Sequence, residues 1–292
     1  MDKNQFEQKF AEIDSWGQSL TNELSKFITT SPAEFIYHYT NANGLLGIVS
    51  SGRVWATHVS RLNDKSENIY GFELVKNFTE RNRQYLSRAL LEKVSTELCA
   101  VDTYVACYSE IINLLSQWRS YGGSSVGYCL GFETKRMATV DGRMPLLEKV
   151  IYGDGKAIAL LDYLMQQINC YLNSKKFGQV EVGYQIGMLA ATLNNIACII
   201  KHPSFEEEGE YRQIYQPKNS KRKLQQYTRS GQYGLTPYVK IDFPEDDLLP
   251  LETITIGPCE DFNKEEKMLK ELLSQNRYKN VEILRSIIPL RT

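Results

Sequence analysis

The 292-residue sequence has few of the residues and motifs that identify common enzyme classes. It contains three histidines, at positions 38, 58 and 202, and none of its six cysteines forms a C-x-x-C pair or has zinc-site spacing to a histidine. The GxGxxG and Walker patterns of nucleotide-binding loops, the GxSxG pattern and the HExxH pattern are all missing. The sequence therefore offers no evident metal site and no evident covalent nucleophile.

Long apolar runs and a strong net charge are also missing. No run reaches the roughly 18 apolar residues of a transmembrane helix, and the N-terminus lacks the apolar core of a signal peptide. The net charge of −1 gives no overall attraction to nucleic acid or to an anionic membrane, although the basic run Lys218–Lys223 is either a local contact for nucleic acid or a solvated loop. Because the cysteines lie in apolar sequence, we expect reduced thiols and a cytoplasmic protein.

Enough apolar sequence is present for a folded core, since 42% of the residues are apolar and 11% are aromatic. Apolar periodicity predicts helices over residues 4–27, 43–50, 66–100, 114–121, 156–174, 181–200 and 264–273. It predicts strands over 35–40, 54–59, 103–109, 126–132, 147–152, 211–215, 237–243, 252–256 and 281–286, with a polar, basic loop after 215. Helices and strands do not alternate regularly, which favours an α+β fold. We expect one domain at 31–292, with a helical extension at 1–30 and a helical insertion at about 154–200.

The strand predicted at 35–40 carries the first candidate site. Residues two apart on a strand face the same side, so His38 and Thr40 share one face, while Tyr37 and Tyr39 share the other. A short helix follows and ends at Gly52. An imidazole beside a hydroxyl can bind a ribose diol or an amide; the alternative is a hydrogen-bonded histidine at the rim of the sheet.

The second candidate lies in the helix predicted at 114–121. Trp118 and Arg119 precede the glycine-rich loop 122–125, where an aromatic ring and a guanidinium can bind a planar ring and a phosphate. The alternative is a helix anchored in the core by Trp118, with Arg119 in solvent.

The third candidate is the acidic segment that precedes the strand at 211–215. If that strand begins at Glu208, then Glu208 and Glu210 share a face, and Arg212 lies on it and orients Glu210. Two carboxylates on one face suit the stabilisation of an oxocarbenium-like centre or the activation of a hydroxyl nucleophile. The alternative is a solvated acidic loop.

The segment Tyr37–Gly52 resembles the opening of ADP-ribosyltransferase-like folds, especially the DarT-type nucleic-acid ADP-ribosyltransferases and the tRNA 2′-phosphotransferases. These proteins carry a His-x-Thr strand followed by a short helix. The sequence from about 35 to 291 also resembles a widespread bacterial domain family of unknown function. The shared motifs are Tyr37–Gly52, Leu62–Asp64, Ser116–Tyr121, Phe205–Arg212 and Ser286–Arg291.

The resemblance implies a split mixed β-sheet with flanking helices, which binds NAD as a substrate in its cleft without a metal. By this resemblance, the NAD-binding residues are His38 and Thr40, a nicotinamide-stacking Tyr108 or Tyr121, and Arg119 at the pyrophosphate. Glu210 would stabilise the oxocarbenium-like state, and Glu208 would activate the acceptor. A fixed carboxylate in a cleft of low dielectric suits this chemistry.

We therefore expect an NAD-dependent ADP-ribosyltransferase, a bacterial toxin or phage-defence effector that modifies nucleic acid or protein. Three alternatives stay open: an NAD glycohydrolase that depletes NAD, a non-catalytic sensor or binding module, and an RNA-processing phosphotransferase.

Overall fold

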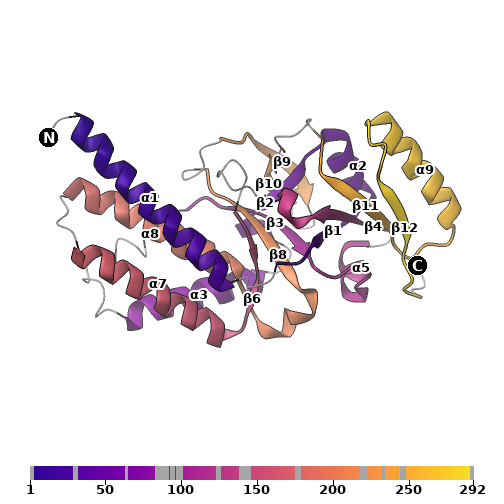
Figure 1. Cartoon of the computed structure of the whole chain (residues 1–292). Coiled ribbons are helices and arrows are strands. Elements are labelled where there is room, and N and C mark those ends of the chain that lie inside the picture. Colours follow the sequence, from indigo (N-terminus) through magenta and orange to yellow (C-terminus); the bar gives the residue numbers. More distant parts are fainter. Residues whose placement is uncertain are drawn as a thin grey trace. The chain divides into compact units, whose positions relative to one another are not determined.

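The computed structural model describes residues 3–28, 32–62, 65–82, 92, 96, 101–122, 126–137, 146–174, 179–217, 223–231, 234–241, 243 and 248–289. The chain forms two compact units (Figure 1). A helical unit comprises residues 1–31, 62–102 and 150–205, and a sheet unit comprises residues 32–61, 103–149 and 206–292. The turn predicted at 63–64, the loop at 123–125, most of the helix predicted beyond residue 82 and all of the basic run except Lys223 lie outside the described residues.

The helical unit brings together three segments that are distant in sequence. Its helices are α1 (Lys3–Ile28), α3 (Lys65–Arg81), α7 (Asp154–Ser174) and α8 (Gln179–Ile199), and its strands β6 (Ile151–Tyr152) and β7 (Ile200–Lys201) form a parallel pair. Helix α1 packs on α7 and α8, and α3 packs on α8. A Cβ atom on Gly71 of α3 would lie 2.1 Å from the carbonyl oxygen of Ala197, so glycine permits the close contact of α3 with α8. The predicted extension and insertion thus belong to one unit with residues 62–102.

The described residues of the sheet unit form one mixed sheet of ten strands. Its strands are β1 (Phe35–Asn41), β2 (Val54–His58), β3 (Tyr104–Ser109), β4 (Gly127–Glu133), β5 (Leu146–Lys149), β8 (Glu210–Tyr215), β9 (Gln226–Gly231), β10 (Gly234–Ile241), β11 (Leu251–Ile256) and β12 (Glu282–Arg285). Their order is β12-β11-β4-β1-β3-β2-β10-β9, with β8 paired to β3 and β5 paired to β8. The β11–β12 pair is parallel and the other pairs are antiparallel.

The sheet forks at β3. Strand β8 pairs with β3 along its whole length and so occupies one edge. The other edge is shared, because β1 pairs with it at Ser109 and β2 pairs with it at Tyr104 and Val105. Between these contacts β1 and β2 diverge from each other, and we call the gap beside residues 106–108 the fork. The short helix α2 (Ala42–Ser51) connects β1 to β2.

Helices cover both faces of the β1–β4–β11 part of the sheet. On one face, α2 and α9 (Phe262–Gln275) bury leucines against the main core, which includes Ile36, Leu130 and Ile254. On the other face, α5 (Leu115–Gly122) buries Trp118 against Tyr39. The remaining short elements of this unit are η1 (Val59–Arg61) and α6 (Thr134–Met137), while η2 (Pro203–Glu208) leads into β8. Figure 1 shows α9 alongside β11 and β12 near the C-terminus.

The α+β class predicted from the sequence is confirmed, as is the segment strand–helix–strand from β1 to β2. Gly52 ends α2, and its N–H bonds to the carbonyls of Ile48 and Val49. Two predictions were wrong. The strand predicted at 147–152 is interrupted at Val150, so that β5 joins the large sheet and β6 pairs with β7. The basic loop predicted after residue 215 contains an edge strand, β9, whose alternately exposed residues lack the apolar pattern of a buried strand.

Candidate functional site

His38 lies at the fork of the sheet. Its Nδ1 atom donates a hydrogen bond to the carbonyl oxygen of Cys107 at 2.8 Å, within the stretch of β3 that neither β1 nor β2 covers. Because a carbonyl can only accept, Nδ1 carries the proton, and Nε2 of the neutral ring is an acceptor. Its ring lies 5.7 Å from that of Tyr108 between centroids. Burial lowers the pKa of His38; the Cys107 bond opposes this and the charge of Arg229 adds to it, which keeps the imidazole neutral at pH 7.

Arg229 of the edge strand β9 lies among aromatic rings. Register places it on one face with Trp55 of β2 and Tyr238 of β10. The guanidinium carbon is 5.6 Å from the Trp55 ring centroid and 5.8 Å from that of Tyr238, and Nη2 donates to Thr57 Oγ1 at 3.0 Å. Lys240 lies over the rings of Trp55 and Tyr227. Tyr227 and Arg229 of this strand thus lie on a cation–aromatic face, while Gln226, Thr228 and Ser230 are exposed to solvent.

Arg229 forms no ion pair with any carboxylate in the described part of the chain. Burial lowers the pKa of its guanidinium, which nevertheless stays protonated because an arginine titrates far above pH 7. Nε of Arg229 and Nε1 of Trp55 are both buried without a hydrogen-bond acceptor among the described residues. Buried donors of this kind are uncommon in folded proteins, and ligand-binding sites are one place where they occur.

The Trp55 ring is held in place by α2. A Cβ atom on Gly47 would lie 2.4 Å from two carbons of the Trp55 six-membered ring, so any larger residue at position 47 would displace the indole. The helix that follows the His38 strand therefore also positions the aromatic side of the fork. On the same helix, Gly44 packs against the Thr40 hydroxyl in the same way, which places Thr40 against α2.

Glu210 and Arg212 form a buried ion pair on β8. Nε of Arg212 donates to Oε1 of Glu210 at 2.8 Å and Nη2 donates to Oε2 at 3.1 Å, and the two side chains are 6% and 2% exposed. Register places Glu148 of β5 opposite Arg212 on the same face. The prediction that Arg212 orients Glu210 is confirmed by this bidentate contact.

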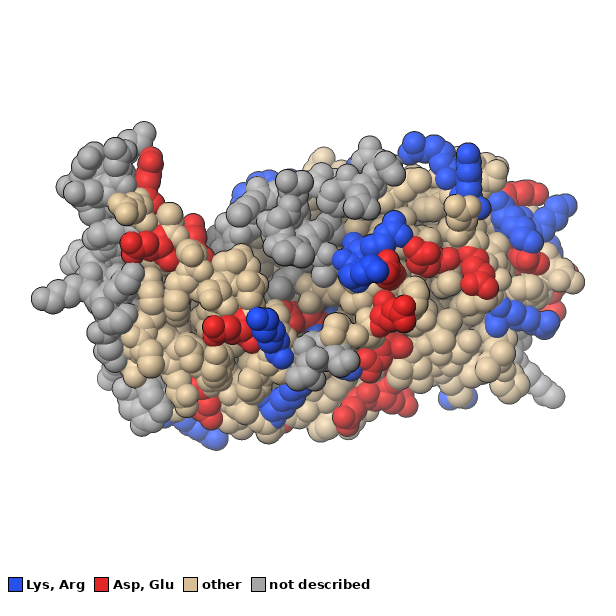
Figure 2. All heavy atoms as spheres, viewed as in Figure 1, with Lys and Arg blue, Asp and Glu red and all other residues tan. Residues whose placement is uncertain are grey.

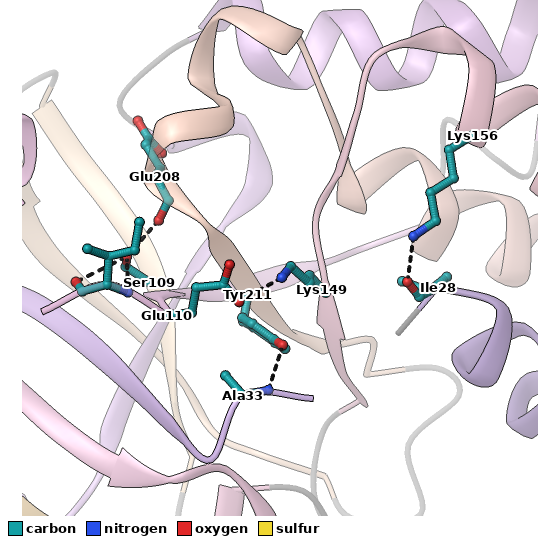
Figure 3. A network of polar contacts seen from close by, with 9 residues as sticks. Ile28, Ala33, Ser109, Glu110, Lys149, Lys156, Glu208 and Tyr211 are labelled. Atoms are coloured by element: carbon teal, nitrogen blue, oxygen red, sulfur yellow. Dashed lines mark hydrogen bonds and ion pairs between the residues drawn. The ribbon is translucent and has the colours of Figure 1, made fainter. Parts of the chain in front are cut away.

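Glu208 does not lie on the strand. Strand β8 begins at Glu210, and Gly209 precedes it with a φ of +50° that favours glycine, so the predicted common face of Glu208 and Glu210 is wrong. Ser109 Oγ donates to the backbone carbonyl of Glu208 at 2.6 Å. Figure 3 shows the Glu208 side chain directed away from this contact, and shows Glu110 reaching Lys149, an ion pair of 2.6 Å.

The α5 residues pack on the face of β1 that carries Tyr37 and Tyr39, opposite the face of His38. Trp118 is a core residue whose ring is 4.9 Å from Tyr39, and Tyr121 packs on the same cluster. Arg119 is exposed. This is the arrangement of a helix anchored by a core tryptophan, the alternative that the sequence left open.

Register decides which predicted residues meet. His38 and Tyr108 share one face, and Tyr108 donates to Gln213 Oε1 there at 3.0 Å. Glu210 pairs with Ser109, and Ser109 pairs with Tyr37, so these three form a row on the opposite face at the apex of the fork. Glu210 is therefore one residue away from His38 in register but turned to the other face.

The residue that sequence reasoning missed is Arg229. A signal was present, since the two runs 226–231 and 234–241 meet at Gly231 and Gly234, and closely spaced glycines between two such runs are typical of a β-hairpin. Trp55 was likewise unassigned, because its role depends on register with β10. No group of three or more metal-ligating side chains occurs among the described residues, and no described helix is both long and apolar enough to span a membrane.

Comparison with known proteins gives a partial match. A family described as "Protein of unknown function (DUF2971)" matches residues 117–213, about a third of the chain, from α5 to β8. Neither the curated proteins nor the solved structures gave a match. The matched region is similar to an uncharacterised domain family and includes the Trp118 helix and the Glu210–Arg212 pair. It does not extend to His38, Trp55 or Arg229.

Proposed function

We propose that the protein is an NAD-dependent ADP-ribosyltransferase-like enzyme that binds NAD at the fork of the sheet. The observation that carries the proposal is the fork itself: two strands share one edge of β3, and a neutral His38 occupies the gap between them. This agrees with the split sheet and His-x-Thr strand that the resemblance implies. Of the two candidate tyrosines, Tyr108 is the one beside His38, where its ring is buried and its hydroxyl donates to Gln213.

The chemistry requires cleavage of the bond between ribose C1′ and the nicotinamide nitrogen. The bonding pair leaves with nicotinamide, and the positive charge that develops on the ribose is relieved when an acceptor atom attacks C1′ and loses its proton. Nε2 of His38, as an acceptor, can bind a ribose hydroxyl and orient the sugar. The proposal gives His38 this binding role and keeps Glu210, at the fork apex, as the carboxylate that stabilises the developing charge.

The test is incubation with NAD labelled in the adenine half, with nucleic acid or protein from a bacterial extract as acceptor. Release of nicotinamide with transfer of label to a macromolecule supports the transferase. Release without transfer identifies the alternative NAD glycohydrolase. The absence of both products, with NAD binding intact, refutes the enzymatic proposal.

A second candidate is a non-catalytic binding module, and the Glu210–Arg212 pair favours it. A carboxylate already bonded through both oxygens to a buried guanidinium is engaged before any ligand binds, which favours a structural role for it. This candidate predicts that NAD or ADP-ribose binds, that His38→Ala weakens binding, and that no nicotinamide is released at any protein concentration. Lys135→Ala provides a matched control, since Lys135 pairs with Glu133 at the surface of the same unit.

A further inference from the structure

We propose that Arg229, flanked by Trp55 and Tyr238, is the phosphate-binding residue of the fork, and that the site recognises a nucleotide by its pyrophosphate group. This inference rests on the proposed ligand site, because it names the group by which the ligand is recognised. It replaces the assignment of the pyrophosphate to Arg119, which the sequence suggested by resemblance and which is exposed on α5.

The first argument is charge. Arg229 is partly buried, and a guanidinium withdrawn from solvent is commonly accompanied by a carboxylate, as the fully buried Arg212 is by Glu210. Arg229 has a single hydrogen-bond acceptor, Thr57, among the described residues, and the rest of its environment consists of aromatic faces. An anionic ligand supplies the missing counter-charge, and phosphate matches the geometry of a guanidinium because two N–H groups can bond to two oxygens.

The second argument is the neighbourhood. The rings of Trp55 and Tyr238 lie 4.9 Å apart, and that of Tyr227 lies 5.6 Å from Tyr238, which forms a row of three tilted rings across three strands. Lys240 adds a second positive charge over the same rings. Aromatic rings beside cations suit a ligand that carries both a planar base and phosphates.

The third argument is locality. On the face drawn in Figure 2, acidic and basic side chains lie interspersed over the described part of the surface, in agreement with the net charge of −1. This face therefore has no broad positive patch in its described part that would attract an anion. Recognition of an anion there depends on individual groups, and Arg229 is a partly buried cation without a carboxylate partner among the described residues.

The fourth argument links Arg229 to His38. Register places Arg229 on the face that carries Thr57 and Glu210, opposite the face of His38, and its charge contributes across the gap of the fork to lowering the pKa of His38. A bound phosphate would neutralise that charge, so the two groups are coupled through the ligand. His38 therefore reports on occupancy of the Arg229 site without any need for turnover.

The experiment measures binding of pyrophosphate, ADP-ribose and adenosine by calorimetry to the full-length protein and to three variants. The variants are Arg229→Gln, Arg229→Lys and the control Arg136→Gln, which removes an arginine paired with Glu252 at the surface. We expect Arg229→Gln to weaken ADP-ribose and pyrophosphate by about 10- to 100-fold, the usual effect of a lost charge-assisted contact, with a smaller loss for Arg229→Lys. Adenosine, which lacks phosphate, should bind the protein and the Arg229→Gln variant equally, and Arg136→Gln should bind all three ligands normally.

NMR titration of the His38 ring supplies the second readout. We expect the pKa of His38 to rise in Arg229→Gln and to rise when pyrophosphate binds to the unmodified protein. Unchanged affinity for ADP-ribose in Arg229→Gln would overturn the proposal even if NAD were turned over. Loss of ADP-ribose binding in that variant without nicotinamide release by any form would support the phosphate site and reject the enzyme, so the two failures are distinguishable.

Discussion

Two arginines of the sheet unit, the buried Arg212 and the partly buried Arg229, are accommodated in opposite ways. Arg212 on β8 is bonded at two points to Glu210, and the pair is buried on the face that also carries Glu148. Arg229 on β9 has aromatic faces and one hydroxyl instead of a carboxylate. A pair that satisfies itself contributes to the fold, whereas a cation without a counter-charge retains the capacity to bind one. This difference is why we propose the ligand site at Arg229, whereas Glu210 is already engaged by Arg212.

The largest expected effect is the loss of one member of the Arg212 pair. Arg212→Met should lower the free energy of unfolding by about 3 kcal/mol, since Glu210 would lose a bidentate, buried partner. Arg229→Met should change it by less than about 1 kcal/mol, because no carboxylate depends on Arg229. Urea denaturation followed by circular dichroism measures both. Equal losses of unfolding free energy in the two variants would contradict the difference proposed between Arg212 and Arg229.

Glu210→Gln separates a structural from a catalytic carboxylate. We expect a loss of about 3 kcal/mol in the single variant and recovery of most of it in Glu210→Gln with Arg212→Met, where no charge remains in the pair. If Glu210 acts in catalysis, nicotinamide release should stay abolished in the stabilised double variant. If the double variant regains nicotinamide release together with stability, the role of Glu210 is structural.

Thr57→Val tests the single hydroxyl that Arg229 contacts. Removing this acceptor should cost about 1 kcal/mol of stability, the usual net value of a hydrogen bond. It should also weaken ADP-ribose binding less than Arg229→Gln does, because the charge remains. Thr236→Val is a control on the same face, as Thr236 is opposite Arg229 and its hydroxyl bonds to a backbone carbonyl at 3.2 Å. A larger ligand effect for Thr57→Val than for Arg229→Gln would contradict this view of the site.

The smallest effect concerns pH. Because the pKa of His38 is lower in the folded protein than its usual value near 6.5, the unfolded chain binds more protons as the pH falls through that value. This contribution to stability is therefore present above about pH 6.5 and declines as the pH falls towards the folded pKa. In Arg229→Gln the decline should be shallower. Thermal denaturation between pH 5 and 8 measures it, and a steeper decline in the variant would contradict the proximity of the two groups.

Sequence alone predicted those parts of the fold that are marked by a local pattern, such as apolar periodicity or a glycine that ends a helix. Strand β1 and helix α2 follow from the pattern of apolar residues and from Gly52 at the end of the helix. Strand β9 was missed because a two-sided, half-exposed edge strand has little apolar alternation, and its register comes from pairing with β10. The start of the strand was predicted two residues too early, at Glu208, because Gly209, with its positive φ, turns the chain immediately before β8.

The candidate site was harder to predict than the fold. His38 was found because histidine is rare in this chain and the strand around it is recognisable. Arg229 and Trp55 are far apart in sequence and meet through two strand pairings that periodicity does not reveal. Which face of the sheet Glu210 occupies also depends on register across β8, β3 and β1, and a shift of one residue would reverse it.

The two units are built from six consecutive segments that alternate between them, so the chain passes from one unit to the other five times. No single truncation can therefore yield either unit as a continuous piece of chain. During synthesis, β3 emerges long before β8, its partner along the whole of one edge. One edge of β3 therefore stays unpaired until the segment 150–205 and then β8 have been synthesised. During this interval the nascent chain is most exposed to misassociation.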